Sequence, residues 1–227
     1  MNTLEVCSGT LRSALAAVAG GATRIELCSA LSLDGLTPSV ATIAELRRRF
    51  PSLRIHVLIR PREGDFVYDE AEVLVMEQDI HAAVQAGATA IVSGALLPDN
   101  TIDLPVTARL VSAAGGLPFT FHRAFDLVPD QSAALEQLRV LGVRRVLTSG
   151  GAPTAEAGIP ALRQLVQQAQ DDIIILPGGG VNRHNARRIL QETGATEIHG
   201  SCSVLLPNGL RETSPEEVRA VLDALNR

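Results

Sequence analysis

The chain has 227 residues, of which 46% are hydrophobic and 20% are charged, and its formal net charge is −5. This acidic balance argues against nucleic acid as a partner, because phosphate binding needs a basic surface. No apolar run approaches the roughly 20 residues that span a bilayer, and no N-terminal stretch has the character of a signal peptide. With three cysteines in all, we expect a cytoplasmic protein with free thiols and no membrane partner.

Short apolar runs rich in β-branched residues alternate with longer amphipathic runs along the whole chain. The predicted strands are Leu4–Ser8, Arg24–Ser29, Arg54–Arg60, Ala90–Ala95, Pro118–Ala124, Arg145–Ser149, Asp172–Pro177 and Glu197–Ser201. Helical patterns lie between them, for example at Pro38–Arg49, Glu70–Ala86 and Pro129–Leu141. Thr37 predicts an N-cap before a first-turn proline. Gly87 and Gly194 follow helical stretches, where a left-handed stop is favoured.

Eight strand–helix units in succession predict an α/β protein with parallel strands covered by helices. Eight repeats close a (β/α)8 TIM barrel, whereas a doubly wound sheet more often has five or six strands. No linker interrupts the pattern, so we predict a single barrel domain over residues 1–227. An open α/β sheet remains the alternative. Because barrel chemistry occurs at the carboxyl ends of the strands, the polar residues at those ends are the candidate site.

The first two predicted strands each end in a Glu-x-Cys pair. Strand side chains alternate, so Glu5 shares a face with Cys7, and Glu26 shares a face with Cys28. Neighbouring strands lie about 4.8 Å apart, so the two sulfurs can approach closely enough to hold one soft ion such as Cu(I). The alternative is that both cysteines are small apolar members of the barrel core.

The two glutamates also require partners, because burial of an unpaired carboxylate is costly. Arg60 and Arg123 are the candidate cations, and His122 is a candidate proton carrier. One hypothesis is acid–base catalysis in an anion-binding mouth, with Glu5 or Glu26 as the base and His122 as the acid. The alternative is a buried salt-bridge network that only fills the barrel.

Glycine-rich turns follow the last two predicted strands. Gly178, Gly179 and Gly180 come after the seventh strand, and Ser201 comes after the eighth. Many barrels bind phosphate at this place with backbone N–H groups. The turns therefore predict a site for a small anion, although glycine runs also serve tight turns.

Segments from the first strand to the eighth match a known family. They are Leu-Glu-Val-Cys at 4–7, Arg-Ile-Glu-Leu-Cys-Ser at 24–29, Gly-Leu-Thr-Pro-Ser at 35–39, Ile-Arg-Pro-Arg at 59–62, Gly-Asp-Phe at 64–66 with Tyr68, Thr-Phe-His-Arg-Ala-Phe-Asp at 120–126, Arg-Val-Leu-Thr-Ser-Gly-Gly at 145–151 and Pro-Gly-Gly-Gly-Val at 177–181. By these motifs the chain resembles the copper homeostasis protein CutC family. The resemblance implies a (β/α)8 barrel, a cytoplasmic setting, a homo-oligomer and a link to copper tolerance. For some relatives it also implies Cu(I) held by two cysteines, at the positions of Cys7 and Cys28.

Three features depart from the family pattern. Glu63 occupies a loop that usually reads Arg-Gly-Gly-Asp-Phe, and Cys202 stands where a small non-thiol residue is common. The segment Val204–Ser214 is shorter than is typical, so we expect a more open pocket. Three hypotheses result: a copper-homeostasis protein that binds Cu(I), a barrel hydrolase or lyase for a small anionic substrate, and a non-catalytic scaffold. The scaffold leaves the inward charges unexplained.

Overall fold

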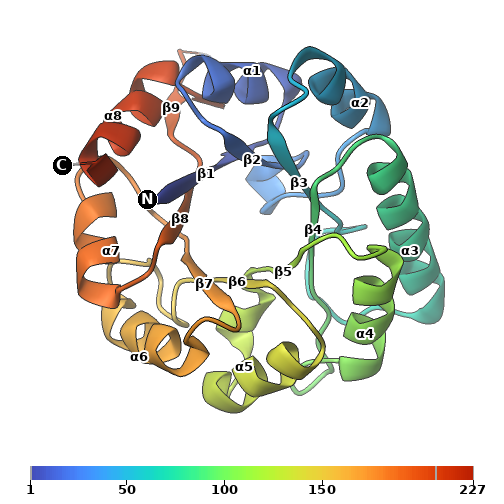
Figure 1. Cartoon of the computed structure of the whole chain (residues 1–227). Coiled ribbons are helices and arrows are strands. Elements are labelled where there is room, and N and C mark those ends of the chain that lie inside the picture. The colour runs from blue at the N-terminus through green and yellow to red at the C-terminus, as the bar shows by residue number, and fades with distance from the viewer. Residues whose placement is uncertain (1, 208, 227) are drawn as a thin grey trace.

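The computed structural model describes residues 2–207 and 209–226, and it contains a ring of eight parallel strands surrounded by helices (Figure 1). The hydrogen-bonded order is β7-β6-β5-β4-β3-β2-β1-β8, and β7 lies beside β8 in Figure 1, so the ring is nearly closed. The prediction of a (β/α)8 barrel is therefore confirmed. The strands are β1 (Thr3–Ser8), β2 (Arg24–Leu27), β3 (Arg54–Leu58), β4 (Ala90–Ser93), β5 (Phe119–Phe121), β6 (Arg145–Thr148), β7 (Ile174–Pro177) and β8 (Glu197–Gly200).

An α-helix follows each barrel strand and covers the outside of the ring. The helices are α1 (Leu11–Ala19), α2 (Val40–Arg49), α3 (Glu70–Gln85), α4 (Leu104–Ala113), α5 (Gln131–Val140), α6 (Ile159–Ala169), α7 (Ala186–Thr193) and α8 (Pro215–Asn226), with 3-10 helices η1 (Leu31–Leu33) and η2 (Arg123–Leu127) in the loops. Within the described ranges, no helix combines the length and the apolar character that crossing a bilayer requires.

The sequence signals for helix ends are confirmed in part. Gly194 ends α7 with a φ of +80°, as a left-handed stop requires. The predicted N-cap at Thr37 is wrong, because α2 begins at Val40 with Ser39 before it. The Thr37 hydroxyl instead donates to the carbonyl of Arg60 and accepts from its N–H. This pair of hydrogen bonds ties the β2–α2 loop to the end of β3.

Several strands end earlier than the apolar pattern predicts. β3 ends at Leu58 rather than Arg60, and β5 ends at Phe121, so Arg123 already belongs to η2. Arg60 and Arg123 therefore lie on loops at the carboxyl end of the barrel.

The two faces of the strands are buried against different surroundings. Outward side chains such as Val6, Ile25 and Ile55 belong to the large apolar core between the ring and the helices. Inside the ring, Cys7, Cys28, Leu58 and Val92 form a separate small cluster of buried apolar residues. The rest of the interior includes buried charged and polar side chains, and these define the candidate site.

The segment after β8 forms a short antiparallel hairpin. Its strands are β9 (Ser203–Leu205) and β10 (Arg211–Thr213), and the N–H of Ser214 donates to the carbonyl of Cys202 at its base. The chain then enters α8, which packs against α1, α7 and β1. The short segment noted in the sequence is therefore this hairpin.

Candidate functional site

A cavity of about 460 Å³ opens at the carboxyl ends of the barrel strands. Eight predicted site residues line it: Cys7, Glu26, Arg60, His122, Arg123, Gly179, Gly180 and Ser201. His199 joins them from β8, and Ser203 and Arg211 join from the hairpin. Three other predicted residues, Glu5, Cys28 and Gly178, lie outside this lining. The barrel mouth thus gathers most of the polar side chains that the sequence singled out.

Glu5 is fully buried below the cavity and is surrounded by cationic and imidazole groups. Its Oε2 lies 3.0 Å from Arg24 Nε and 2.7 Å from His56 Nδ1, and its Oε1 lies 3.0 Å from His199 Nδ1. Burial alone acts to raise the pKa of Glu5, but His56, His199 and Arg24 together hold it well below the usual value. Glu5 is therefore an ionised carboxylate and a weak base.

The expectation that Arg60 or Arg123 neutralises Glu5 is wrong. Arg24 does so, because it lies on β2 two residues before Glu26 and hence on the same inward face. That alternation was available in the sequence. Arg24 was not predicted as a partner because it lies at the amino end of β2, whereas barrel sites are expected at the carboxyl ends of the strands.

Arg24 also belongs to a second set of ion pairs, nearer the amino ends of the strands. Its Nη2 lies 2.6 Å from Glu197 Oε2, and Arg145 donates to both carboxylate oxygens of Glu197 at 2.8 and 3.0 Å. Although burial opposes it, these two arginines lower the pKa of Glu197 to about 2. We call Glu5, Arg24, His56, Arg145 and Glu197 the barrel floor. Acidic and basic side chains alternate in the barrel floor. For these residues the structure agrees with the alternative of a buried salt-bridge network.

The two cysteines meet between β1 and β2. Cys7 Sγ lies 3.9 Å from Cys28 Sγ and donates to Glu26 Oε1 at 3.7 Å, while Cys28 Sγ donates to the carbonyl of Ser8 at 3.7 Å. The contact with Cys28, together with burial, raises the pKa of Cys7 well above its usual value. Without a metal, Cys7 is therefore a thiol, and it would release its proton on binding a metal ion as a thiolate.

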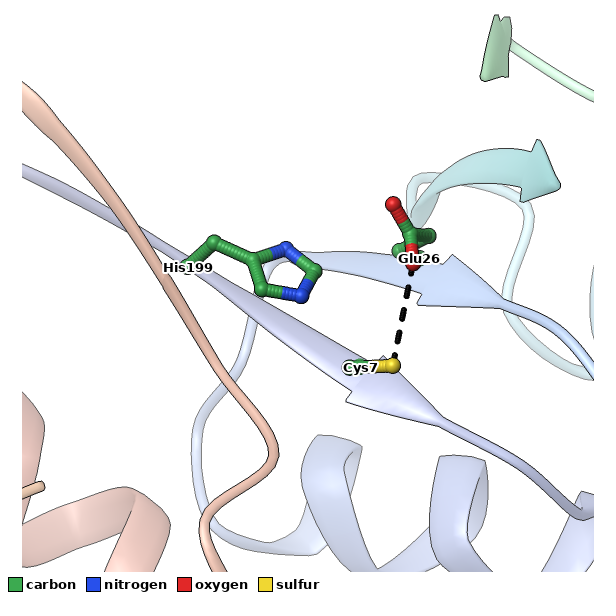
Figure 2. Close-up of side chains that lie close together, drawn as sticks. All are labelled: Cys7, Glu26 and His199. Carbon is green, nitrogen blue, oxygen red and sulfur yellow. Dashed lines mark hydrogen bonds between the residues drawn. The ribbon is translucent and has the colours of Figure 1, made fainter. Parts of the chain in front are cut away.

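Glu26 and His199 lie close to Cys7, as Figure 2 shows, and all three residues line the cavity. Burial raises the pKa of Glu26, and its Oε2 has no hydrogen-bond partner among the described residues. Burial acts to lower the pKa of His199, but the charge of Glu26 and the hydrogen bond to Glu5 raise it. One ligand atom from each of Cys7, Glu26 and His199 lies within 4.8 Å of the others. We call these three residues the mouth cluster, and their spacing is compatible with a metal ion.

Arg60 lines the cavity but is largely occupied by the backbone. Its guanidinium donates to the carbonyls of Leu33, Gly35 and Gly64 at 2.9, 3.1 and 2.9 Å, and it lies over the Phe66 ring. Only its Nε has no hydrogen-bond partner within the described part of the chain. Arg60 thus anchors two loops of the mouth and has little capacity left for an anion.

His122 is a neutral imidazole with one unused donor. Burial and the charge of Arg60 lower its pKa to about 3, and its Nδ1 accepts a hydrogen bond from the N–H of Ala124. The proton must therefore sit on Nε2, which is buried and has no partner among the residues described. A group in this state is poorly suited to the role of general acid that the sequence suggested.

Arg123 reaches across the mouth toward the glycine turn. Its Nε donates to Asp126 at 2.8 Å and its Nη2 donates to Ser149 at 3.2 Å. A Cβ placed on Gly179 would lie 3.4 Å from Arg123 Cζ, and Gly179 itself has a φ of +101°. The guanidinium and the turn are thus in direct contact. Beside them, the hydroxyls of Ser201 and Ser203 are hydrogen-bonded to each other at 3.0 Å.

The fold and the site define a class: a (β/α)8-barrel protein with buried thiol, carboxylate and imidazole groups at the barrel mouth. A model of the CutC family matches residues 2–204. The chain belongs to the CutC family, and the resemblance noted in the sequence is confirmed. The match ends at the short hairpin that follows β8.

Individual relatives agree with this assignment. A family protein CutC of Bacteroides thetaiotaomicron is 50% identical over 197 residues, which cover 87% of this chain and 79% of that protein. A human copper homeostasis protein cutC homolog is 44% identical over 208 residues, covering 92% and 76%. The crystal structure of a putative copper homeostasis protein CutC from Streptococcus agalactiae superposes with a TM-score of 0.84 at 37% identity, covering 88% and 99%. A thiamine phosphate pyrophosphorylase from Pyrococcus furiosus shares the fold alone, at 17% identity and a TM-score of 0.63 over 99% and 95%.

Proposed function

We propose that this chain is a copper-homeostasis protein that binds Cu(I) through Cys7 and Cys28. The observation that carries the proposal is the 3.9 Å separation of the two sulfurs at the barrel mouth. Metal–thiolate bonds of about 2.3 Å allow one ion to join sulfurs up to roughly 4.6 Å apart. The pair therefore needs no rearrangement of the strands to share an ion.

The surroundings of the pair suit a soft monovalent ion. Thiolates are the ligands that select Cu(I), which accepts low coordination numbers. Leu58 and Val92 pack with the two cysteines in a small buried cluster. The human and streptococcal relatives are also named as copper homeostasis proteins. Chemistry and family thus support the same ion.

A Cu(I) titration under reducing conditions, against a competing chelator, tests the proposal. We expect Cys7→Ser and Cys28→Ser each to weaken Cu(I) binding by on the order of 100-fold or more, because direct ligands contribute more than their neighbours do. Cys202→Ser is the matched control. Its thiol is also buried but lies outside the cavity lining, and burial raises its pKa to about 12. Equal affinities in all four proteins would refute the proposal.

A small anion is the second candidate ligand of the mouth. The unused Nε2–H of His122 favours it, and the amides of Gly179 and Gly180 donate to no described atom. Arg123 adds a positive charge beside this turn. A titration with inorganic phosphate is expected to show binding that Arg123→Gln weakens. Binding that is absent, or that is unchanged in Arg123→Gln, would exclude this site. Acid–base catalysis by Glu5 or Glu26 with His122 gains no comparable support, because Glu5 is a weak base and a neutral imidazole such as His122 is a very weak acid.

Three further predictions concern the whole protein. A reducing cytoplasmic location would keep all three cysteines as the free thiols observed here. The family resemblance implies a homo-oligomer, and sedimentation measures whether the chain forms one.

A single cooperative unfolding transition is expected if residues 1–227 form one domain.

A further inference from the structure

We infer that the mouth cluster, Cys7, Glu26 and His199, is a site for a divalent cation of borderline softness such as Zn²⁺, with one coordination position open to the cavity. The inference does not require Cu(I) binding. The two sites share Cys7 but differ in every other ligand, because the proposed Cu(I) pair uses Cys28. They can therefore be separated by substitution.

The position of the three ligands follows from strand geometry. Cys7, Glu26 and His199 lie on β1, β2 and β8, which are neighbours in the sheet, and all three point inward. Their ligand atoms lie within 4.8 Å of one another. Bonds of about 2.0–2.3 Å place the ligand atoms of a tetrahedral ion about 3.5 Å apart, so binding requires the side chains to move roughly 1 Å closer together. Figure 2 shows the His199 ring directed toward Cys7 and Glu26.

Glu5 prepares His199 for this role. The ionised carboxylate of Glu5 lies 3.0 Å from His199 Nδ1. Because a carboxylate can only accept, Nδ1 carries a proton and donates a hydrogen bond to Glu5. The other ring nitrogen, Nε2, remains for a ligand. A carboxylate that orients a metal-binding imidazole in this way is the usual arrangement behind metal sites, because it fixes the tautomer and raises the basicity of the ligand. The contact also holds the ring in place before an ion arrives.

Glu26 supplies the independent sign of a missing ligand. Its side chain is only 5% exposed, its Oε2 has no hydrogen-bond partner, and the described residues form no ion pair with it. A buried carboxylate in this condition is costly unless something completes its coordination. A cation bound beside Cys7 and His199 would do so. The barrel floor shows the contrast, since Glu5 and Glu197 each have an arginine within 3.0 Å.

Charge and donor type select the ion. A thiolate and a carboxylate together carry two negative charges, which a divalent ion neutralises and a monovalent ion does not. Sulfur, nitrogen and oxygen donors in one set are typical of Zn²⁺, whereas Cu(I) prefers sulfur alone. Three protein ligands leave the fourth tetrahedral position free, as in catalytic rather than structural zinc sites. Here that position faces a cavity that His122 and Arg123 also line with N–H donors.

Titration with Co²⁺ tests the inference, because Co²⁺ occupies zinc-type sites and its thiolate complexes absorb in the near ultraviolet. The full chain, reduced and freed of metal, is titrated with Co²⁺ and then with competing Zn²⁺. We expect a thiolate-to-metal band in the wild type that Cys7→Ser abolishes. Glu26→Gln and His199→Asn are expected to weaken Co²⁺ binding by more than about 100-fold. Cys28→Ser is expected to leave it within about 3-fold, since Cys28 is not a ligand.

The same variants titrated with Cu(I) separate this inference from the proposed function. Cu(I) binding is expected to need Cys28 and to tolerate Glu26→Gln, which is the reverse of the Co²⁺ pattern. If Cys28→Ser removes the Co²⁺ band while Glu26→Gln retains it, the divalent ion occupies the cysteine pair and the inference is wrong. Absence of any Co²⁺ band in a folded wild type also overturns it. His199→Asn removes a hydrogen-bond partner of Glu5. If this variant fails to fold, Glu26→Gln decides the result, because Oε2 of Glu26 has no partner to lose.

Discussion

The barrel floor and the mouth cluster both bury ionisable side chains inside the same ring, yet only the carboxylates of the floor are paired with arginines. In the floor, Glu5 and Glu197 each have an arginine at ion-pair distance. In the mouth cluster, Glu26 has one weak contact with Cys7 and one oxygen without a partner. Charges that are fully paired stabilise a structure, whereas unpaired buried groups indicate a place for a ligand. Replacement of glutamate by glutamine at Glu5 and at Glu26 tests this contrast, and the same change at Glu45 on the surface gives a reference for an exposed ion pair.

The largest effect is expected at Glu5. Glu5→Gln removes the charge that faces Arg24, His56 and His199 in a site without water access. Breaking a buried ion pair from one side costs about 3–5 kcal/mol of unfolding free energy, because the remaining charge stays buried. Urea denaturation monitored by circular dichroism measures the loss. A variant as stable as the wild type would show that the floor network is not needed for the fold.

A small effect is expected at Glu45, an ion pair on the surface of α2. Arg48 and Arg49 lower the pKa of Glu45 to about 2, so the pair stabilises the folded state above the unfolded pKa near 4.5. That contribution disappears as pH falls from about 4.5 toward 2. Glu45→Gln should thus be slightly less stable than the wild type at pH 6, with the difference narrowing by pH 3. Denaturation at both pH values checks this, and a difference that grows in acid would contradict it.

The smallest loss of stability is expected at Glu26, although this residue is buried, as Glu5 is. Its Oε2 has no partner to lose, and glutamine keeps the shape of the side chain. Glu26→Gln should therefore leave the unfolding free energy within about 1 kcal/mol of the wild type. The same variant is expected to lose the divalent ion. A large destabilisation would place Glu26 with the floor rather than with the mouth cluster.

Residue patterns in the sequence predicted much of this structure because they reflect local geometry. Alternation along a strand placed Cys7 and Glu26 inside the barrel, and the repeat of eight units predicted the ring. Arg24 and Glu197 obey the same alternation, two residues before Glu26 and His199. They were not predicted because they lie at the amino ends of their strands, where no barrel site is expected. The predicted N-cap at Thr37 is wrong for a different reason. The Thr37 hydroxyl is hydrogen-bonded to the backbone of Arg60, which is distant in sequence.

The sequence by itself determined the barrel, the family and the polar residues that reach its mouth, since these depend on periodicity and short motifs. Only the tertiary structure decided which of them act together. Closing the ring puts β8 beside β1, so His199 from near the end of the chain meets Glu5 and Cys7 from its beginning. The pairing of β1 with β2 gives Glu5 its cation, Arg24, while the described residues place no arginine at ion-pair distance from Glu26. Pairing across a closed sheet depends on register and distance in space, which no spacing along the chain records.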